Sequence, residues 1–316
     1  MNRLAFSPLA FSPGFGLSSP HLQTLFAGSL SGGIAPTSTP MYVLLTDGDQ
    51  LCCEVSAARN RSLDDPTVVL VHGLGGSHES NYMIRMARKL YNKGYKVVRV
   101  NLRGCGSGAG LSKRPYNAGT SQDLQALINV LKQQAPSSEI SVIGFSLGGS
   151  VVLKLAGECG DDAFVKQFIA VSAPLDLHAT VKLIQAPRHY LYHRYYLNKM
   201  CRQAKEWLKS PVQSIYDFDN VVTAPLWGYE SADEYYEKVS GIHYIPKICR
   251  PCYLLMAEDD PFVSLEPLTR CRFSLSTKVF VTSHGGHMGF LAKGCSAPDS
   301  HWLDDQLIQW LDNDRI

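Results

Sequence analysis

Several features that would point to other protein classes are missing from this 316-residue chain. No apolar run approaches the roughly 18–20 residues that cross a bilayer, which argues against a transmembrane helix. The formal charge is only +2, from 30 basic and 28 acidic residues, so a strongly basic nucleic-acid-binding protein is excluded. The nine cysteines are an odd number and several lie in apolar runs, which argues against a disulfide framework. A chain that is 45% hydrophobic and 18% charged can instead bury a substantial core.

The N-terminal region also lacks the pattern of a targeting segment. Residues 1–30 are interrupted by Pro8, Pro13 and Pro20, so they contain no uninterrupted apolar stretch of the kind that a secretory signal needs. We therefore expect a cytoplasmic protein with no stable membrane insertion. Cys249 and Cys252 have the spacing of a metal-binding pair, but no second pair completes four zinc ligands. We predict no metal and no organic cofactor.

Strand-like and helix-like segments alternate along most of the chain. Apolar runs typical of buried strands occupy residues 67–72, 95–101, 139–145, 167–173, 253–257 and 278–282. Segments with apolar residues at helical spacing lie between several of these runs and at the C-terminal end. This alternation predicts an α/β fold with a mostly parallel central sheet and helices on both faces.

The alternation stops between residues 176 and 246, where aromatic residues recur at helical spacing and β-branched runs are few. We interpret this segment as a helical cap inserted into the fold. The predicted core is then formed by residues 41–175 and 247–316. Residues 1–40 are predicted to be an N-terminal extension that packs on this core.

The strongest chemical signal is the sequence Gly-Phe-Ser-Leu-Gly-Gly at residues 144–149, between a predicted strand and a predicted helix. The pattern G-x-S-x-G in this context is the nucleophile elbow, a sharp turn that exposes a serine. Side chains at Gly144 or Gly148 would collide with neighbouring backbone. We therefore predict Ser146 as a nucleophile at the N-terminus of a helix, where negative charge is favoured.

A serine nucleophile needs a general base and an acid that orients it, in the chain order Ser, Asp or Glu, His. The acidic turn at residues 258–260 follows a predicted strand, and Asp260 before Pro261 fits the acid best, with Asp259 as the alternative. Two histidines follow the last strand. We predict His287 as the base, because the two glycines before it allow the loop to bend back towards Ser146; His284 is the alternative.

Acyl transfer also needs hydrogen-bond donors for a developing oxyanion. The loop at residues 72–76 directly follows a predicted strand, so we predict the backbone N–H groups of Leu74 and Leu147 as the oxyanion hole. His72 is interpreted as a histidine that shapes this loop. The glycines of residues 104–110 superficially resemble a dinucleotide-binding loop, but Pro115 interrupts the helix that would receive the phosphates.

Within the predicted cap, residues 189–196 concentrate aromatic and basic side chains. Tyrosine and leucine at helical spacing are typical of a helix that packs on the core. Insertions at strand ends of open α/β sheets also lie over the ligand crevice, and tyrosine offers a broad apolar face with one polar tip. We predict Tyr192, Tyr195 and Tyr196 as substrate-binding residues that roof an acyl pocket, with core packing as the alternative.

Together these motifs resemble the α/β-hydrolase superfamily. Residues 19–24, 72–76, 101–104, 173–176, 257–262 and 285–290 resemble more narrowly the YheT-like branch, which is related to the ABHD lipases and esterases. The resemblance covers nearly the whole chain and implies a serine esterase.

The first functional hypothesis is a serine carboxylic ester hydrolase that uses Ser146, Asp260 and His287 through an acyl-enzyme. Its partner would be a small-molecule ester, with lipid-like esters included, and no nucleic acid. The same three residues would also serve an acyltransferase, and a non-catalytic binding protein on the same scaffold is the hypothesis from another class.

Overall fold

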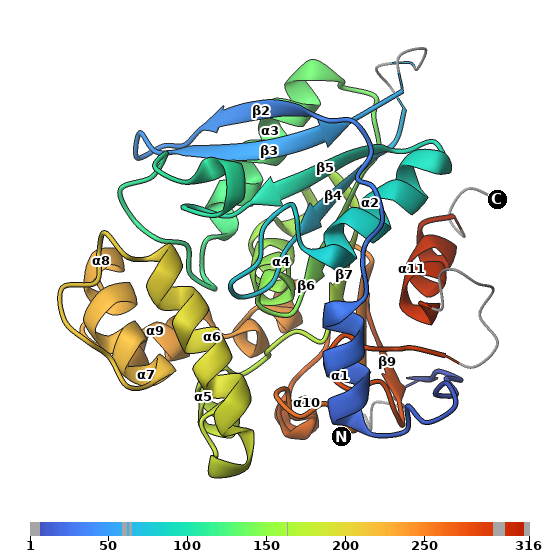
Figure 1. Ribbon diagram of the computed structural model, residues 1–316. Helices are drawn as coiled ribbons and strands as arrows, with labels where there is room; N and C mark the ends of the chain where they lie inside the picture. The colour runs from blue at the N-terminus through green and yellow to red at the C-terminus, as the bar shows by residue number, and fades with distance from the viewer. Residues whose placement is uncertain (1–6, 59–61, 63–64, 163, 293–300, 313–316) are drawn as a thin grey trace.

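The computed structural model describes residues 7–58, 62, 65–162, 164–292 and 301–312. Residues 1–6 of the predicted N-terminal extension and residues 293–300 and 313–316 of the predicted core lie outside the described residues. A central sheet runs through the molecule, with helices on both of its faces (Figure 1).

The sheet has nine strands in the order β1-β9-β8-β7-β6-β4-β5-β3-β2 among the described residues. The strands are β1 (Ser7–Pro8), β2 (Thr39–Leu44), β3 (Gln50–Ser56), β4 (Thr67–Val71), β5 (Lys96–Asn101), β6 (Ile140–Phe145), β7 (Val165–Val171), β8 (Cys252–Ala257) and β9 (Thr277–Thr282). β3 is antiparallel to both β2 and β5, and all the other pairs are parallel. The predicted mostly parallel sheet is therefore confirmed.

The helices cover two apolar clusters, one on each face of the sheet. They are α1 (Pro20–Ser29), α2 (Asn81–Asn92), α3 (Ser121–Gln134), α4 (Leu147–Glu158), α5 (Leu177–Ile184), α6 (Tyr190–Gln203), α7 (Ile215–Phe218), α8 (Ala224–Trp227), α9 (Ala232–Val239), α10 (Glu266–Arg270) and α11 (Trp302–Asp312). α3 and α4 bury apolar side chains with one face of the sheet, and α2 and α11 do so with the other. Burial of these faces is the main source of stability for such a layered fold.

The strand register brings several loops to one edge of the sheet. Val71 pairs with Gly144, and Phe145 pairs with Val171, so β4, β6 and β7 end side by side. Met256 and Ala257 at the end of β8 pair with Val281 and Thr282 of β9. Because parallel strands place their following loops at the same edge, the loops after these strands are close together.

Helices α5 to α9 all lie in the chain between β7 and β8, and Figure 1 shows them in yellow to orange on one side of the sheet. The boundaries of the cap at residues 176 and 246 stay a prediction. Each of the six strands that we located from the sequence is present, with small shifts at its ends. No strand is predicted from the sequence before residue 67, so β1, β2 and β3 are additions from the structure.

Candidate active site

Ser146 lies at a sharp turn between β6 and α4. Its backbone has φ 51° and ψ −122°, a strained conformation for a residue with a side chain. A Cβ atom on Gly144 would lie 2.4 Å from the carbonyl oxygen of Gly148, and one on Gly148 would lie 2.4 Å from the carbonyl oxygen of His72. Only glycine fits at both positions, so the local sequence permits the turn that presents Ser146.

A continuous chain of hydrogen bonds runs from Ser146 through His287 to Asp260. Oγ of Ser146 lies 2.9 Å from Nε2 of His287, and Nδ1 of His287 lies 2.8 Å from Oδ2 of Asp260. An ionised carboxylate only accepts hydrogen bonds, so Nδ1 donates and Nε2 is left to accept from the serine hydroxyl. The other oxygen of Asp260 accepts from the N–H groups of Phe262 and Val263. These bonds hold the carboxylate in place.

The two alternatives from the sequence form a separate pair. Nδ1 of His284 lies 3.4 Å from Oδ2 of Asp259. Oδ1 of Asp259 accepts from the backbone N–H of Gly286 at 2.8 Å, so this side chain holds the loop before His287. The structure therefore brings Ser146, His287 and Asp260 together and pairs Asp259 with His284.

The loop after β4 passes directly against the serine. A Cβ atom on Gly73 would lie 3.0 Å from Cβ of Ser146. Within the described residues, no acceptor takes the backbone N–H of Leu74 in this loop or that of Leu147 at the start of α4. Both predicted oxyanion donors are thus unused by the described part of the chain.

Hydrogen bonds from several side chains shape this loop. The N–H of Gly73 donates to the hydroxyl of Tyr82 at 2.9 Å, and that of Gly75 donates to the hydroxyl of Tyr116 at 2.8 Å. His72 binds the carbonyl oxygen of Gly73 through Nδ1 at 2.8 Å. Burial lowers the pKa of His72 to about 4, so the ring is neutral and structural near neutral pH. The interpretation of His72 as a loop-shaping residue is confirmed.

Helix α1 holds the loop that contains His287. Oγ1 of Thr24 accepts from the backbone N–H of His287 at 2.9 Å, across 263 residues of sequence. The buried side chain of Gln23 donates to the carbonyl oxygen of Leu291 and accepts from its N–H. Residues 19–24 carry a family resemblance in the sequence, but no local pattern there predicts a role at the site.

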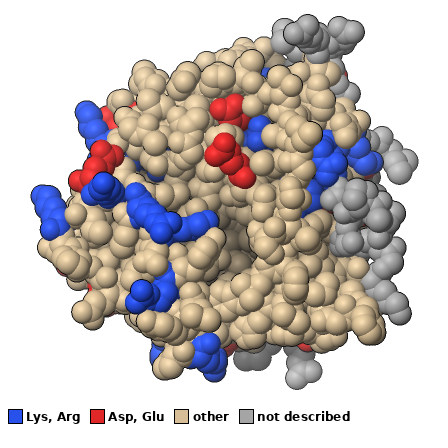
Figure 2. Space-filling model, in the orientation of Figure 1, with Lys and Arg blue, Asp and Glu red and all other residues tan. Residues whose placement is uncertain are grey.

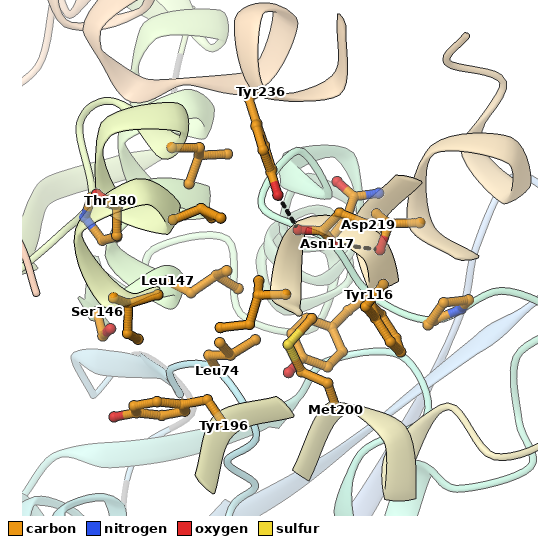
Figure 3. Close-up of a pocket in the computed structure, with 18 of the residues that line it drawn as sticks. Leu74, Tyr116, Asn117, Ser146, Leu147, Thr180, Tyr196, Met200, Asp219 and Tyr236 are labelled. Atoms are coloured by element: carbon orange, nitrogen blue, oxygen red, sulfur yellow. Dashed lines mark hydrogen bonds between the residues drawn. The ribbon is translucent and has the colours of Figure 1, made fainter. Parts of the chain in front are cut away.

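Two cavities meet at Ser146 and His287. The first, which we call the apolar chamber, is lined by residues of α5, α6 and α9. Figure 3 shows its lining side chains, with Leu74, Leu147 and Met200 among the apolar ones. The second, which we call the polar groove, is lined by residues of α1, α2 and α6, such as Thr24, Asn81 and Lys199. Figure 2 shows a hollow between the positions of α6 and α1, with Lys and Arg side chains along its α6 side.

The three predicted substrate-binding tyrosines occupy different positions on α6. Tyr196 lines both cavities, and Tyr195 lines only the polar groove. Tyr192 lines neither of these two cavities among the described residues; its ring packs on Phe262 at 4.6 Å and stacks on His21. Phe262 in turn contacts the ring of His287, with 4.9 Å between the centroids. For Tyr192 the geometry favours a packing role over substrate binding, which is the alternative that the helical spacing also allows.

A family model described as the alpha/beta hydrolase fold matches residues 66–206, the part of the chain that includes the loop after β4 and the turn at Ser146. The chain therefore has the α/β-hydrolase fold and is similar to members of the α/β-hydrolase superfamily. The fold and the resemblance that the sequence predicted are both confirmed.

Relatives in this superfamily cover most of the chain. The protein YheT of Escherichia coli, whose name gives it as a candidate esterase, is 28% identical over 96% of this chain and 94% of its own length. The monoacylglycerol lipase of Saccharomyces cerevisiae is 29% identical over 78% of this chain and 59% of its own length. The human phospholipase ABHD3 is 26% identical over 84% of this chain and 67% of its own length. These relatives support the prediction of an esterase-like hydrolase at the level of enzyme class.

Solved structures of α/β hydrolases share the fold. The Pyrococcus furiosus esterase Pf2001 aligns over 90% of this chain and 97% of its own, with a TM-score of 0.59 and 19% identity. In the described part of the chain, no helix is both long and apolar enough to span a bilayer. No group of three or more His, Cys, Asp or Glu side chains among the same residues is arranged to hold a metal ion.

Proposed function

We propose that this α/β hydrolase is a serine carboxylic ester hydrolase that works through an acyl-enzyme. The hydroxyl of Ser146 attacks the ester carbonyl, and Nε2 of His287 takes its proton. His287 then gives this proton to the departing alcohol as the carbon–oxygen bond of the ester breaks. In the second half of the reaction His287 activates a water molecule, which releases the carboxylic acid and restores Ser146.

Asp260 and the backbone supply the electrostatic part of the mechanism. The Asp260 carboxylate keeps the proton of His287 on Nδ1 and stabilises the imidazolium that forms after attack. The N–H groups of Leu74 and Leu147 donate to the oxygen that becomes negative in the tetrahedral intermediate. A donor of this kind contributes about 10²–10³-fold in kcat in other serine enzymes.

The observation that supports this proposal best is the unbroken hydrogen-bond chain from Ser146 to Asp260, beside two backbone donors that have no acceptor among the described residues. The names esterase, lipase and phospholipase among the relatives agree with ester substrates. We place the acyl chain in the apolar chamber, because its walls are mainly apolar, and the alcohol in the more open polar groove. Residues 176–246 would then act as the cap over the acyl chain.

A Ser146→Ala variant tests the nucleophile. We expect it to keep the wild-type melting temperature, to lose turnover of short p-nitrophenyl esters by at least about 10⁴-fold, and to resist labelling by a fluorophosphonate. The exposed Ser210 offers a matched control, since Ser210→Ala removes the same atom outside the site. Equal turnover by the Ser146→Ala and Ser210→Ala proteins would overturn the proposal.

The acceptor of the acyl group needs its own measurement. Under the proposal, product analysis with an ester and millimolar amounts of a competing alcohol gives the free carboxylic acid as the main product. Predominant transfer to the alcohol would show that the same three residues serve an acyltransferase instead.

A further inference from the structure

A carboxyl group lies across the apolar chamber from Ser146. Asp219 lines this chamber and is only 7% exposed. Figure 3 shows Ser146 and Asp219 on opposite sides of the cavity, with Asp219 beside Tyr236. The mechanism proposed above uses no acid at this position, and no sequence motif predicts one there.

The hydrogen bonds to Asp219 leave part of its capacity unused. Oγ1 of Thr223 donates to Oδ1 at 2.7 Å, and the hydroxyl of Tyr236 donates to Oδ2 at 2.7 Å. An ionised carboxylate has about four acceptor positions, so roughly two remain. Because Asp219 lines the chamber, a group that enters the chamber can reach this side chain.

No cation among the described residues neutralises this carboxylate. The one guanidinium that lines the same chamber, that of Arg103, is bound to Asp47, Asp49 and Asp123. Burial raises the pKa of Asp219 to about 6, against the lowering effect of the two hydroxyl groups. A buried carboxyl group without a charged partner is unfavourable for folding, which favours a role in binding at this position.

The backbone at Asp219 is also irregular. Residues Asp219–Thr223 form a π-helical turn between α7 and α8, with the two hydrogen-bonded residues at its ends. Such turns are rare and are found frequently at functional sites.

We propose that Asp219 binds a hydroxyl group on the acyl chain of the substrate, so that the apolar chamber selects hydroxylated acyl groups. The hydroxyl would donate to an unused acceptor position of the carboxylate. An ammonium group fits less well, because moving a full charge from water into apolar walls is far more unfavourable. A carboxylate on the substrate would be repelled by Asp219. This assignment rests on the proposed ester hydrolase function.

The alternative is that Asp219 only braces Thr223 and Tyr236 within the cap. A brace would affect folding and the turnover of all esters alike. A binding role affects the ratio of kcat/KM for a hydroxylated ester to that for its unsubstituted partner, and this ratio is therefore the quantity to measure.

The experiment uses p-nitrophenyl esters of increasing acyl length, each with and without a terminal hydroxyl. For the wild-type chain we expect the ratio to peak at one length and to reach about tenfold or more, as for a hydrogen bond to a charged group. Asp219→Asn should lower this ratio by about tenfold. Asp233→Asn is the matched control, because Asp233 also accepts from a tyrosine hydroxyl, that of Tyr216, but lines neither cavity.

The wild-type chain also gives a test that needs no variant. Below pH 6 a proton occupies one oxygen of Asp219, so the ratio should rise as the pH increases through about 6. Any change with pH that affects both esters of a pair equally cancels in the ratio. A ratio near one at every length and pH, with unsubstituted esters still hydrolysed, would overturn the role of Asp219 alone. Equal turnover by wild-type and Ser146→Ala chains would overturn the proposed function itself.

Discussion

Two Asp–His pairs lie next to each other at this site and differ mainly in their surroundings. The side chains of His287 and Asp260 are 6% and 2% exposed, whereas those of His284 and Asp259 are 46% and 17% exposed. Asp260 accepts two backbone N–H bonds in addition to the bond from His287. The exposed pair is 3.4 Å apart, which is too long for a good hydrogen bond.

The difference shows that residue type and position in sequence do not by themselves make an acid–base pair. His284 and His287 are three residues apart in the sequence, and Asp259 and Asp260 are adjacent. Of the two histidines, only His287 bonds the hydroxyl of Ser146 through Nε2. Its Nδ1 bonds the carboxylate of Asp260, which is held in place by its other hydrogen bonds. A buried pair keeps its orientation because water does not compete for its hydrogen bonds.

The largest effect is expected from removal of the two imidazoles in turn. His287→Ala should reduce ester turnover by about 10⁴–10⁶-fold, since Ser146 then has no base. His284→Ala should stay within a few-fold of wild type, because its ring is exposed and bonds no catalytic group. The kcat of each purified variant on one p-nitrophenyl ester measures this contrast. The reverse order of activities would move the base to His284.

The carboxylates should give a smaller but equally clear contrast. Asp260→Asn should lower kcat by about 10³–10⁴-fold, because an amide would present a donor to Nδ1 and favour the wrong tautomer of His287. Asp259→Asn keeps an oxygen that can accept from Gly286, so we expect a change of only a few-fold. Similar losses in the two variants would contradict the assignment of the acid to Asp260. Melting temperatures of both proteins separate these effects from a loss of folding.

The contact between Thr24 and the backbone of His287 should have the smallest effect of the three. Thr24→Val removes the oxygen that accepts from the N–H of His287 while it keeps the shape of the side chain. A looser loop should lower kcat by about tenfold and leave KM nearly unchanged. Thr24→Ser keeps the hydroxyl and should restore most of the loss. If Thr24→Ser is as impaired as Thr24→Val, the hydrogen bond is not the reason for the effect.

Much of the fold, and the set of Ser146, His287 and Asp260, could be predicted because the sequence patterns that indicate them are local. The strand and helix around Ser146 are contiguous with the motif, and the glycines at residues 144 and 148 have a steric reason that can be argued from sequence. The sequence distinguishes His287 from His284 as the base less clearly, because the only difference is the flexibility of the two glycines before His287. The geometry agrees with that choice, and the variants above test it.

Other parts of the site depend on contacts that no local pattern reveals. Gln23 and Thr24 reach residues 268 and 263 positions away, and Tyr82 and Tyr116 bind the loop after β4 from two separate segments. Asp219 belongs to no motif. Its position in the chamber depends on how the helices between β7 and β8 fold, which periodicity does not specify.

The hydrogen bonds from helix α1 to the loop of His287 determine when, during synthesis of the chain, the site can form. Synthesis begins at the N-terminus, so Ser146 and the loop after β4 leave the ribosome well before His287 does. The residues that receive His287 are then already present in α1, and the loop can dock only when residues 287–291 have been made. Under the proposed mechanism, a partly made chain would contain the nucleophile without its base. Ester turnover would therefore report that helix α1 and the loop of His287 have come together.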